Sequence, residues 1–301
     1  MRILVTGGVG FVGTNLCKRL LKDNHEVWSF DNYTTGDKEN EIEGVKYCDI
    51  DVRDGIKEGA FFDKVQHAWV HTQEFDVIFH MAALARIQPS IKNPSETIKN
   101  NFNGTLNILE YARKHQIPVI YAGSSSKHHG LYGSPYAWSK YGGEELCKLY
   151  SEVYDLNTSI CRFYNVYGPY QIRTGTYATV IGIFENQFLN NDPLTIVGDG
   201  EQKRDFTHID DIVDGLIKCI GKNHKGEIFE LGSGVNYSIN EVATMFETNS
   251  GLPLVEYISA RPGEYDVTLC DYSKAEQQLG YKPKCDLKTY IKKWIGEYKN
   301  V

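Results

Sequence analysis

The sequence lacks cysteine pairs with CxxC spacing and has no long apolar runs. Its seven cysteines are scattered without a CxxC pair, and their odd number argues against a closed disulfide framework. No stretch approaches the ~20 apolar residues of a membrane helix, and the apolar run at the amino terminus is too short for a signal peptide. We therefore expect a protein of a reducing compartment, the cytoplasm, with no membrane partner.

The chain also lacks long blocks of like charge, internal repeats and low-complexity tracts. Its 32 basic and 39 acidic residues leave a net charge of −7, which disfavours nonspecific binding to nucleic acid. With 301 residues, of which 41% are hydrophobic and 24% charged, the chain is long enough and apolar enough for a substantial globular core.

Short apolar runs alternate with amphipathic segments of helical length through the first half. The expected elements are 3–5, 11–21, 26–30, 45–48, 77–81, 101–115, 119–122, 135–154 and 159–163. This alternation predicts an α/β fold with a Rossmann-type doubly wound parallel sheet. After Gly168 the pattern breaks into turns rich in glycine, proline and asparagine. We expect a larger lobe over 1–166, joined later by about 206–232, and a smaller C-terminal lobe within 167–301.

A glycine-rich turn follows the first expected strand. TGGVGFVG places Gly7, Gly10 and Gly13 where the first helix opens, and Asp31 ends the second strand about 20 residues later. Glycines let the backbone approach a pyrophosphate, and the helix amino end supplies free N–H donors. A carboxylate at Asp31 accepts hydrogen bonds from both ribose hydroxyls of NAD and repels the extra phosphate of NADP.

Tyr136 and Lys140 form a YxxxK pair on one helical face. A phenol with a pKa near ~10 is a poor base at neutral pH unless a cation stabilises the phenolate, which Lys140 could do. The serines at 124–126 follow an apolar strand, and the carboxyl ends of parallel strands are where such sheets bind ligands.

Ten motifs in their expected order resemble one family. They are TGGVGFVG, Asp31-Asn32, Asp51-Val52, HMAA at 80–83, NFNGT at 101–105, the serine run, YxxxK, RFYNVYGP at 162–169, GDGEQKRDF at 198–206 and RPGE at 261–264. The chain resembles the extended short-chain dehydrogenase/reductases, specifically the NAD-dependent sugar-nucleotide epimerases and dehydratases. The resemblance covers nearly the whole chain and implies a larger NAD-binding lobe and a smaller lobe that binds a nucleotide-diphosphate sugar.

The resemblance also implies roles for single residues. Tyr136 would be the base, Lys140 would bind the ribose, and Ser125 would hydrogen-bond the reacting hydroxyl. The implied cofactor-binding positions are Gly7, Gly10, Phe11, Val12, Gly13, Asp31, Asn32, Asp51, Val52, Ala82, Ala83, Asn101, Tyr136, Lys140 and Tyr164.

The implied substrate-binding positions include two arginines, whose paired donors suit a diphosphate. These positions are Ser125, Asn165, Thr179, Val180, Thr195, Ile196, Arg204, Ile239, Arg261, Glu264 and Thr268. For those expected around the nucleotide base, at 179, 180, 195, 196 and 239, ordinary packing in the smaller lobe is an equal alternative. Thr268 would leave space for an N-acetyl group at C2 of the sugar; alternatively it packs in the lobe and the short loop before Tyr136 shapes the pocket.

The implied reaction is 4-epimerisation of a UDP-hexose or UDP-N-acetylhexosamine through a transient 4-keto sugar. The family's 4,6-dehydratases carry acids after the catalytic serine or threonine, whereas Ser126 and Lys127 stand here, which disfavours dehydration. A dehydratase or 4-keto reductase of the same family, and a noncatalytic dinucleotide-binding regulator on this fold, remain the alternatives.

The remaining expectations concern metal and assembly. His128 and His129 lack a converging set of cysteines or carboxylates, so we assign no metal. The resemblance implies a homodimer through the helices that begin near Asn101 and Tyr136. Gly142-Gly143 within the second helix would be costly unless close packing requires it.

Overall fold

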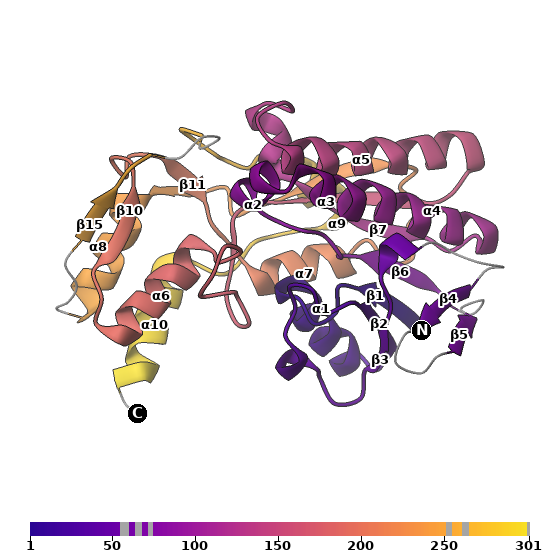
Figure 1. Cartoon of the computed structure of the whole chain (residues 1–301), viewed down its shortest axis with the longest axis horizontal. Helices are drawn as coiled ribbons and strands as arrows, with labels where there is room; N and C mark the ends of the chain where they lie inside the picture. The colour runs from indigo at the N-terminus through magenta and orange to yellow at the C-terminus, as the bar shows by residue number, and fades with distance from the viewer. Residues whose placement is uncertain (55–59, 64–67, 72–74, 251–254, 261–264, 300–301) are drawn as a thin grey trace.

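A computed structural model describes residues 1–54, 60–63, 68–71, 75–250, 255–260 and 265–299. Figure 1 shows two lobes, with a sheet between helices in the larger lobe and α6, α8 and α10 together in the smaller one. None of the helices in the described ranges combines the length and apolar character that crossing a bilayer requires.

A seven-stranded sheet forms the centre of the larger lobe. Its strand order is β13-β8-β7-β6-β1-β2-β3, and every neighbouring pair runs parallel. The strands are β1 (Arg2–Thr6), β2 (Glu26–Asp31), β3 (Lys46–Asp49), β6 (Val77–His80), β7 (Val119–Ser124), β8 (Thr158–Phe163) and β13 (Glu227–Leu231). The predicted doubly wound parallel sheet is therefore confirmed.

Helices cover both faces of this sheet because successive strand residues point to opposite sides. Ile3 and Val5 lie in a core cluster with residues of three helices, whereas Leu4 lies in a second cluster with residues of two others. The helices that pack with Ile3 and Val5 are α1 (Phe11–Lys22), α7 (Ile209–Ile217) and α9 (Ser273–Leu279). The helices that pack with Leu4, on the other face, are α4 (Gly104–His115) and α5 (Pro135–Tyr154). The short helices α2 (Ile87–Lys92) and α3 (Pro94–Ile98) precede α4, and β4 (Ala60–Asp63) pairs with β5 (Ala68–His71) in a separate antiparallel ribbon.

The smaller lobe has its own apolar core. Phe184, Phe246 and Ile291 are buried there on three different helices. Its elements are α6 (Val180–Asn190), α8 (Ile239–Ser250) and α10 (Leu287–Lys299), with the strand pairs β10 (Leu194–Val197)–β15 (Val255–Ile258) and β11 (Lys203–Asp205)–β14 (Asn236–Ser238). A further short pair joins β9 (Val166–Tyr167) to β12 (Thr207–His208).

The chain crosses between the lobes more than once. α7 packs in the core of the larger lobe, and β13 pairs with β8 in its sheet. Ala275 and Leu279 of α9 are also buried in the core beside β1. We propose that the larger lobe comprises 1–166, about 206–232 and the α9 segment, and that the smaller lobe comprises the rest.

A buried ion pair connects α5 to the sheet. Arg162 on β8 donates through Nε to both carboxylate oxygens of Glu144 at 3.0 Å, and through Nη1 to Glu230 on β13 at 2.9 Å. Glu144 is fully buried, and its Oε1 also accepts from the backbone N–H of Ser124 at 3.3 Å. The pair thereby fixes the end of β7 against α5.

We expect Arg162→Met to destabilise the protein strongly, because it leaves the Glu144 carboxylate buried without its partner. Removal of one member of a buried pair costs about 3–5 kcal/mol. Denaturant unfolding followed by circular dichroism measures this change. Arg19→Met, which breaks the exposed pair with Asp23 on α1, is the control and should cost about 1 kcal/mol or less. An equal effect of both substitutions would contradict the structural role of the buried pair.

Candidate active site

The glycine turn between β1 and α1 leaves no room for side chains at two positions. Gly7 has φ +73°, and a Cβ there would lie 2.9 Å from the backbone of Ala82. A Cβ on Gly13 would lie 2.0 Å from the carbonyl oxygen of Gly7. Gly10 caps α1 without a side-chain hydrogen bond, and the first turn, which begins with Phe11 and Val12, has no acidic residue. The helix amino end can therefore receive a phosphate anion on its backbone N–H groups.

Asp31 lies beside this turn at the end of β2. Its carboxylate accepts from the backbone N–H of Val9 at 3.1 Å and of Tyr33 at 2.9 Å. Burial raises the pKa of Asp31, and these two hydrogen bonds partly offset that effect. The acid is thus held at the place where the motif spacing predicted it.

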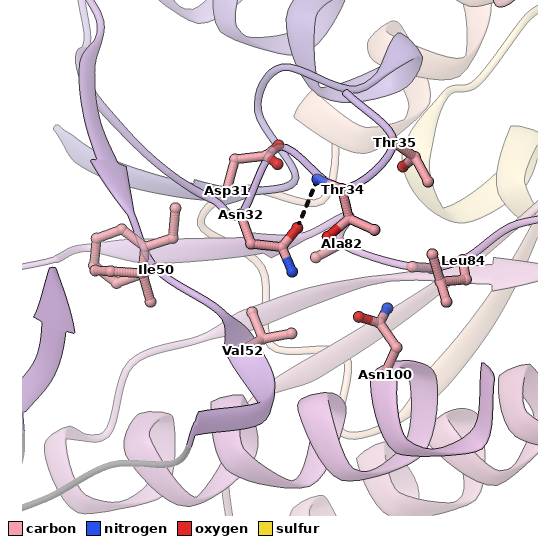
Figure 2. Close-up of a pocket in the computed structure, with 11 residues that line it drawn as sticks. Asp31, Asn32, Thr34, Thr35, Ile50, Val52, Ala82, Leu84 and Asn100 are labelled. Atoms are coloured by element: carbon pink, nitrogen blue, oxygen red, sulfur yellow. Dashed lines mark hydrogen bonds between the residues drawn. The ribbon is translucent and has the colours of Figure 1, made fainter. Parts of the chain in front are cut away.

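A pocket opens next to Asp31 at the carboxyl edge of the sheet (Figure 2). Five of the predicted cofactor-binding residues line it: Asp31, Asn32, Val52, Ala82 and Ala83. Figure 2 also shows the Asn32 side chain accepting from the backbone N–H of Thr34, at 3.1 Å. The other lining residues, which sequence reasoning missed, are Phe30, Thr34, Thr35, Ile50, Leu84 and Asn100.

Asp51 supports the pocket wall through Asn32. Its carboxylate accepts from the Asn32 amide at 2.9 Å and pairs with Arg53 at 2.6 Å. Burial alone would raise the pKa of Asp51, but Arg53 and Asn32 lower it to about 2. The charged carboxylate therefore holds the Asn32 amide in place.

Asn101 lies behind the pocket and Asn100 lines it. The Asn101 side chain accepts from the Leu84 backbone N–H at 2.8 Å and donates to the Leu84 carbonyl at 3.1 Å. Both asparagines are buried in a π-helical turn, Lys99–Asn103. The wider turn changes which residues face inward, and the helical spacing of the sequence gave no signal of it.

The Tyr136 hydroxyl meets the serine run at the end of β7. It donates to Oγ of Ser124 at 3.3 Å, and Ser124 in turn donates to Ser126 at 2.9 Å. Ser125 is 8% exposed and its hydroxyl makes no hydrogen bond within the described residues. Ser124 is therefore a site residue that the sequence analysis did not single out, and the role of Ser125 toward a substrate stays a prediction.

Lys140 is buried on the same helix as Tyr136. Its ammonium lies 4.3 Å from the centre of the Tyr121 ring. Burial lowers the pKa of Lys140 to about 8, and the Glu144 carboxylate limits the decrease. Burial raises the pKa of Tyr136, whereas the Ser124 hydrogen bond and the positive charge of Arg86 lower it. Arg86 thus contributes a positive charge that favours the Tyr136 phenolate, and the role of Lys140 toward this phenolate stays a prediction.

Three predicted substrate residues, Asn165, Arg204 and Thr268, lie on or beside β11. Asn165 donates to the Asp205 carbonyl at 2.9 Å and to Oγ1 of Thr268 at 3.2 Å. Thr268 is 2% exposed, and its hydroxyl also accepts from the Asp205 backbone N–H at 2.9 Å. The guanidinium of Arg204 lies 5.4 Å from the Tyr265 ring centre. These contacts favour the packing alternative for Thr268.

The other predicted substrate residues are spread over the smaller lobe. Ile196 and Ile239 are buried in its core. Thr179 caps α6 by accepting from Gly182, Val180 begins that helix, and Thr195 on β10 contacts Gln187. Arg261 and Glu264 lie outside the described residues. Tyr164, predicted to contact the cofactor, is buried with its ring stacked against His128.

Possible metal ligands meet elsewhere. Ligand atoms of His208, Asp210 and Cys285 lie within 4.8 Å of one another. Nδ1 of His208 already accepts from the backbone N–H of Asp210 at the start of α7. We assign no metal to this group.

The sequence matches the profile of the NAD dependent epimerase/dehydratase family over residues 3–232. The chain belongs to this family. The uncapped helix, the compact glycine turn, Asp31 and the adjoining pocket fit the dinucleotide on which the family depends.

Particular relatives are similar along almost their entire length. The UDP-glucose 4-epimerase of Mycolicibacterium smegmatis is 31% identical, over 100% of this chain and 99% of its own. The UDP-glucose 4-epimerase of Thermotoga maritima, solved with UDP-glucose, superposes with a TM-score of 0.89 at 27% identity, covering 100% and 99% of the two chains. The UDP-glucuronic acid 4-epimerase of Bacillus cereus, solved with UDP-glucuronic acid and NAD, superposes at 0.85 with 29% identity, covering 99% and 100%.

We expect the purified protein to carry NAD and not NADP, because the Asp31 carboxylate would repel the extra phosphate of NADP. Mass spectrometry of the dinucleotide released by denaturation identifies the bound form. Asp31→Asn, which keeps the size and removes the charge, should raise the proportion of NADP. A predominance of NADP in the unsubstituted protein would show that Asp31 does not select the cofactor.

Proposed function

We propose that the protein is an NAD-dependent 4-epimerase of a UDP-hexose or UDP-N-acetylhexosamine. The observation that carries this proposal is the Tyr136 hydroxyl bonded to Ser124 at the carboxyl edge of the sheet, on the helix that also bears Lys140. Relatives that share the whole fold carry the name of 4-epimerase.

The residues at this edge can move the proton that the reaction requires. The phenolate form of Tyr136 would take the proton of the sugar 4-hydroxyl. The hydrogen bond with Ser124 and the positive charge of Arg86 favour this phenolate because both lower the pKa of Tyr136. Ser125, whose hydroxyl has no other partner among the described residues, would hydrogen-bond the same sugar oxygen. Bound NAD would supply the hydride chemistry, taking the hydride from C4 and giving it back to the other face of the 4-keto sugar after that sugar has turned within the site.

The serine turn, residues 124–127, favours epimerisation over the dehydratase alternative. Elimination of water needs an additional acid after the catalytic serine. Here Ser126 bonds to Ser124, and the Lys127 ammonium lies 5.1 Å from the Tyr141 ring centre. Neither group supplies a carboxylic acid.

Incubation of the protein with a panel of UDP-sugars, with products resolved by NMR, tests the proposal. Interconversion of a 4-epimer pair without net consumption of NAD(H) is the expected result. Stoichiometric NAD(P)H oxidation or an accumulating keto product would indicate the reductase or dehydratase alternative. No reaction with any sugar would indicate the noncatalytic alternative.

We expect Tyr136→Phe to lower kcat by about 10²- to 10⁴-fold, since it removes the acid–base group. The melting temperature should change little because only one hydrogen bond, to Ser124, is lost. Tyr298→Phe is the matched control and should keep full activity, because Tyr298 lies on α10 of the smaller lobe and is 45% exposed. Turnover of Tyr136→Phe near that of the control would mean that another residue is the base.

We also propose a homodimer through α4 and α5. Trp138, Leu149 and Val153 of α5 are 39%, 50% and 58% exposed, and their spacing puts them on one helical face. Gly142 and Gly143 give no support for this assembly: a Cβ on Gly142 would meet the Phe102 ring at 2.8 Å, and one on Gly143 would meet the Tyr121 hydroxyl at 2.2 Å. Packing within the chain explains the two glycines.

Leu149→Lys combined with Val153→Lys should convert a dimer to monomers, because charges would then have to be buried at the interface. Light scattering at micromolar concentration measures the mass. Val235→Lys, at an exposed residue outside α5, is the control and should leave the dimer intact. A monomeric mass for the unsubstituted protein would contradict the proposed assembly.

We propose a cytoplasmic location as well. All seven cysteines are free thiols, and six of them are buried. This state suits a reducing compartment.

A further inference from the structure

Arg86 reaches from the larger lobe toward the smaller one. It ends the loop that follows β6 and directly precedes α2, in the segment whose Ala82, Ala83 and Leu84 line the pocket of Figure 2. Its Nε donates to the backbone carbonyl of Tyr177 at 3.0 Å, in the segment between β9 and α6. This bond uses one N–H of the guanidinium and holds the Arg86 side chain against the segment between β9 and α6.

The charge of Arg86 has no acidic partner within the described residues. Arg162 and Arg173, by contrast, pair with the buried carboxylates of Glu144 and Glu185. Arg86 directly precedes α2, and α2 packs against α5, the helix that carries Tyr136. Burial lowers the pKa of Arg86, and the Tyr136 phenol limits this decrease. A partly buried guanidinium in this position is costly unless an anion binds to it.

Tyr136 indicates which part of a substrate this anion belongs to. If Tyr136 acts at the sugar 4-hydroxyl, a cation interacting with its phenol lies near C4. C1, which carries the diphosphate, is across the pyranose ring from C4, whereas C6 is attached to C5, the neighbour of C4. The pyrophosphate of the dinucleotide is expected at the separate glycine turn between β1 and α1. A carboxylate at C6 is therefore the anion within reach of Arg86, and its two oxygens match the guanidinium fork.

We propose that Arg86 binds the C6 carboxylate of the sugar and makes UDP-hexuronic acids the preferred substrates. The proposal rests on the 4-epimerase function and changes its substrate class, from UDP-hexose or UDP-N-acetylhexosamine to the C6-oxidised UDP-hexuronic acids. The UDP-glucuronic acid 4-epimerase of Bacillus cereus, with the same fold, shows that this scaffold accommodates such a sugar.

The test compares kcat/KM for UDP-glucuronic acid and UDP-glucose in the unsubstituted protein, Arg86→Met and Arg86→Lys. The unsubstituted protein should prefer UDP-glucuronic acid. Arg86→Met should lose on the order of 10- to 100-fold more on UDP-glucuronic acid than on UDP-glucose, because the loss shared by both sugars reports the effect of Arg86 on the Tyr136 phenol and only the difference reports a charged hydrogen bond to the carboxylate. The preference of Arg86→Lys for UDP-glucuronic acid should lie between those of the unsubstituted protein and Arg86→Met, because an ammonium keeps the charge but lacks the paired donors of a guanidinium. Arg19→Met on α1 controls for loss of an arginine.

Equal losses on both sugars would overturn the proposal and show that Arg86 acts through Tyr136. Turnover of UDP-glucose but not of UDP-glucuronic acid by the unsubstituted protein would also overturn it, while the epimerase function would stand.

A binding measurement separates this proposal from the epimerase function. Isothermal titration of Tyr136→Phe, with and without Arg86→Lys, needs no turnover. Tighter binding of UDP-glucuronic acid than of UDP-glucose, weakened by Arg86→Lys, supports the role of Arg86 even if no sugar is epimerised. Equal affinity for the two sugars would show that the role is wrong.

Discussion

The ion pair between Arg162 and Glu144 is the interaction on which the candidate site depends. Glu144 is fully buried, so its charge is tolerated only because Arg162 donates to it through Nε and Nη2 and the backbone N–H of Ser124 donates as well. The same carboxylate limits the decrease in the pKa of Lys140. One buried acid thus fixes the serine turn, anchors the helix that carries Tyr136 and limits the decrease in the basicity of a buried lysine.

The dinucleotide side of the site depends on a steric constraint. The backbone of Ala82 and the carbonyl of Gly7 occupy the space where side chains on Gly7 and Gly13 would lie. The Thr6 hydroxyl adds a hydrogen bond from the backbone N–H of Ala82 at 3.1 Å, which joins the loops after β1 and β6. The loop that carries Arg86 is therefore placed by the glycine turn as much as by its own residues.

Much of this arrangement could be predicted from residue spacing. Alternating apolar runs indicated the parallel sheet, because each strand is buried on both faces, and the interval from Gly7 to Asp31 placed the acid beside the glycine turn. Features set by packing gave no such signal. In the π-helical turn at 99–103, Asn100 and not the predicted Asn101 lines the pocket, and the serine run alone does not tell which hydroxyl meets Tyr136. Arg86 acquires its place only because a distant segment supplies the Tyr177 carbonyl.

The third member of the buried network, Glu230, has a consequence for synthesis of the chain. β7, β8 and α5 are complete by Phe163, but β13, which carries Glu230, follows much later in the sequence. A growing chain that has not yet reached β13 holds Arg162 at a sheet edge, without this acid and without the strand that covers β8. The contacts of Arg162 and of His128, next to the serine run, with Glu230 can therefore form only after β13 has been synthesised, which makes this part of the network a late product of folding.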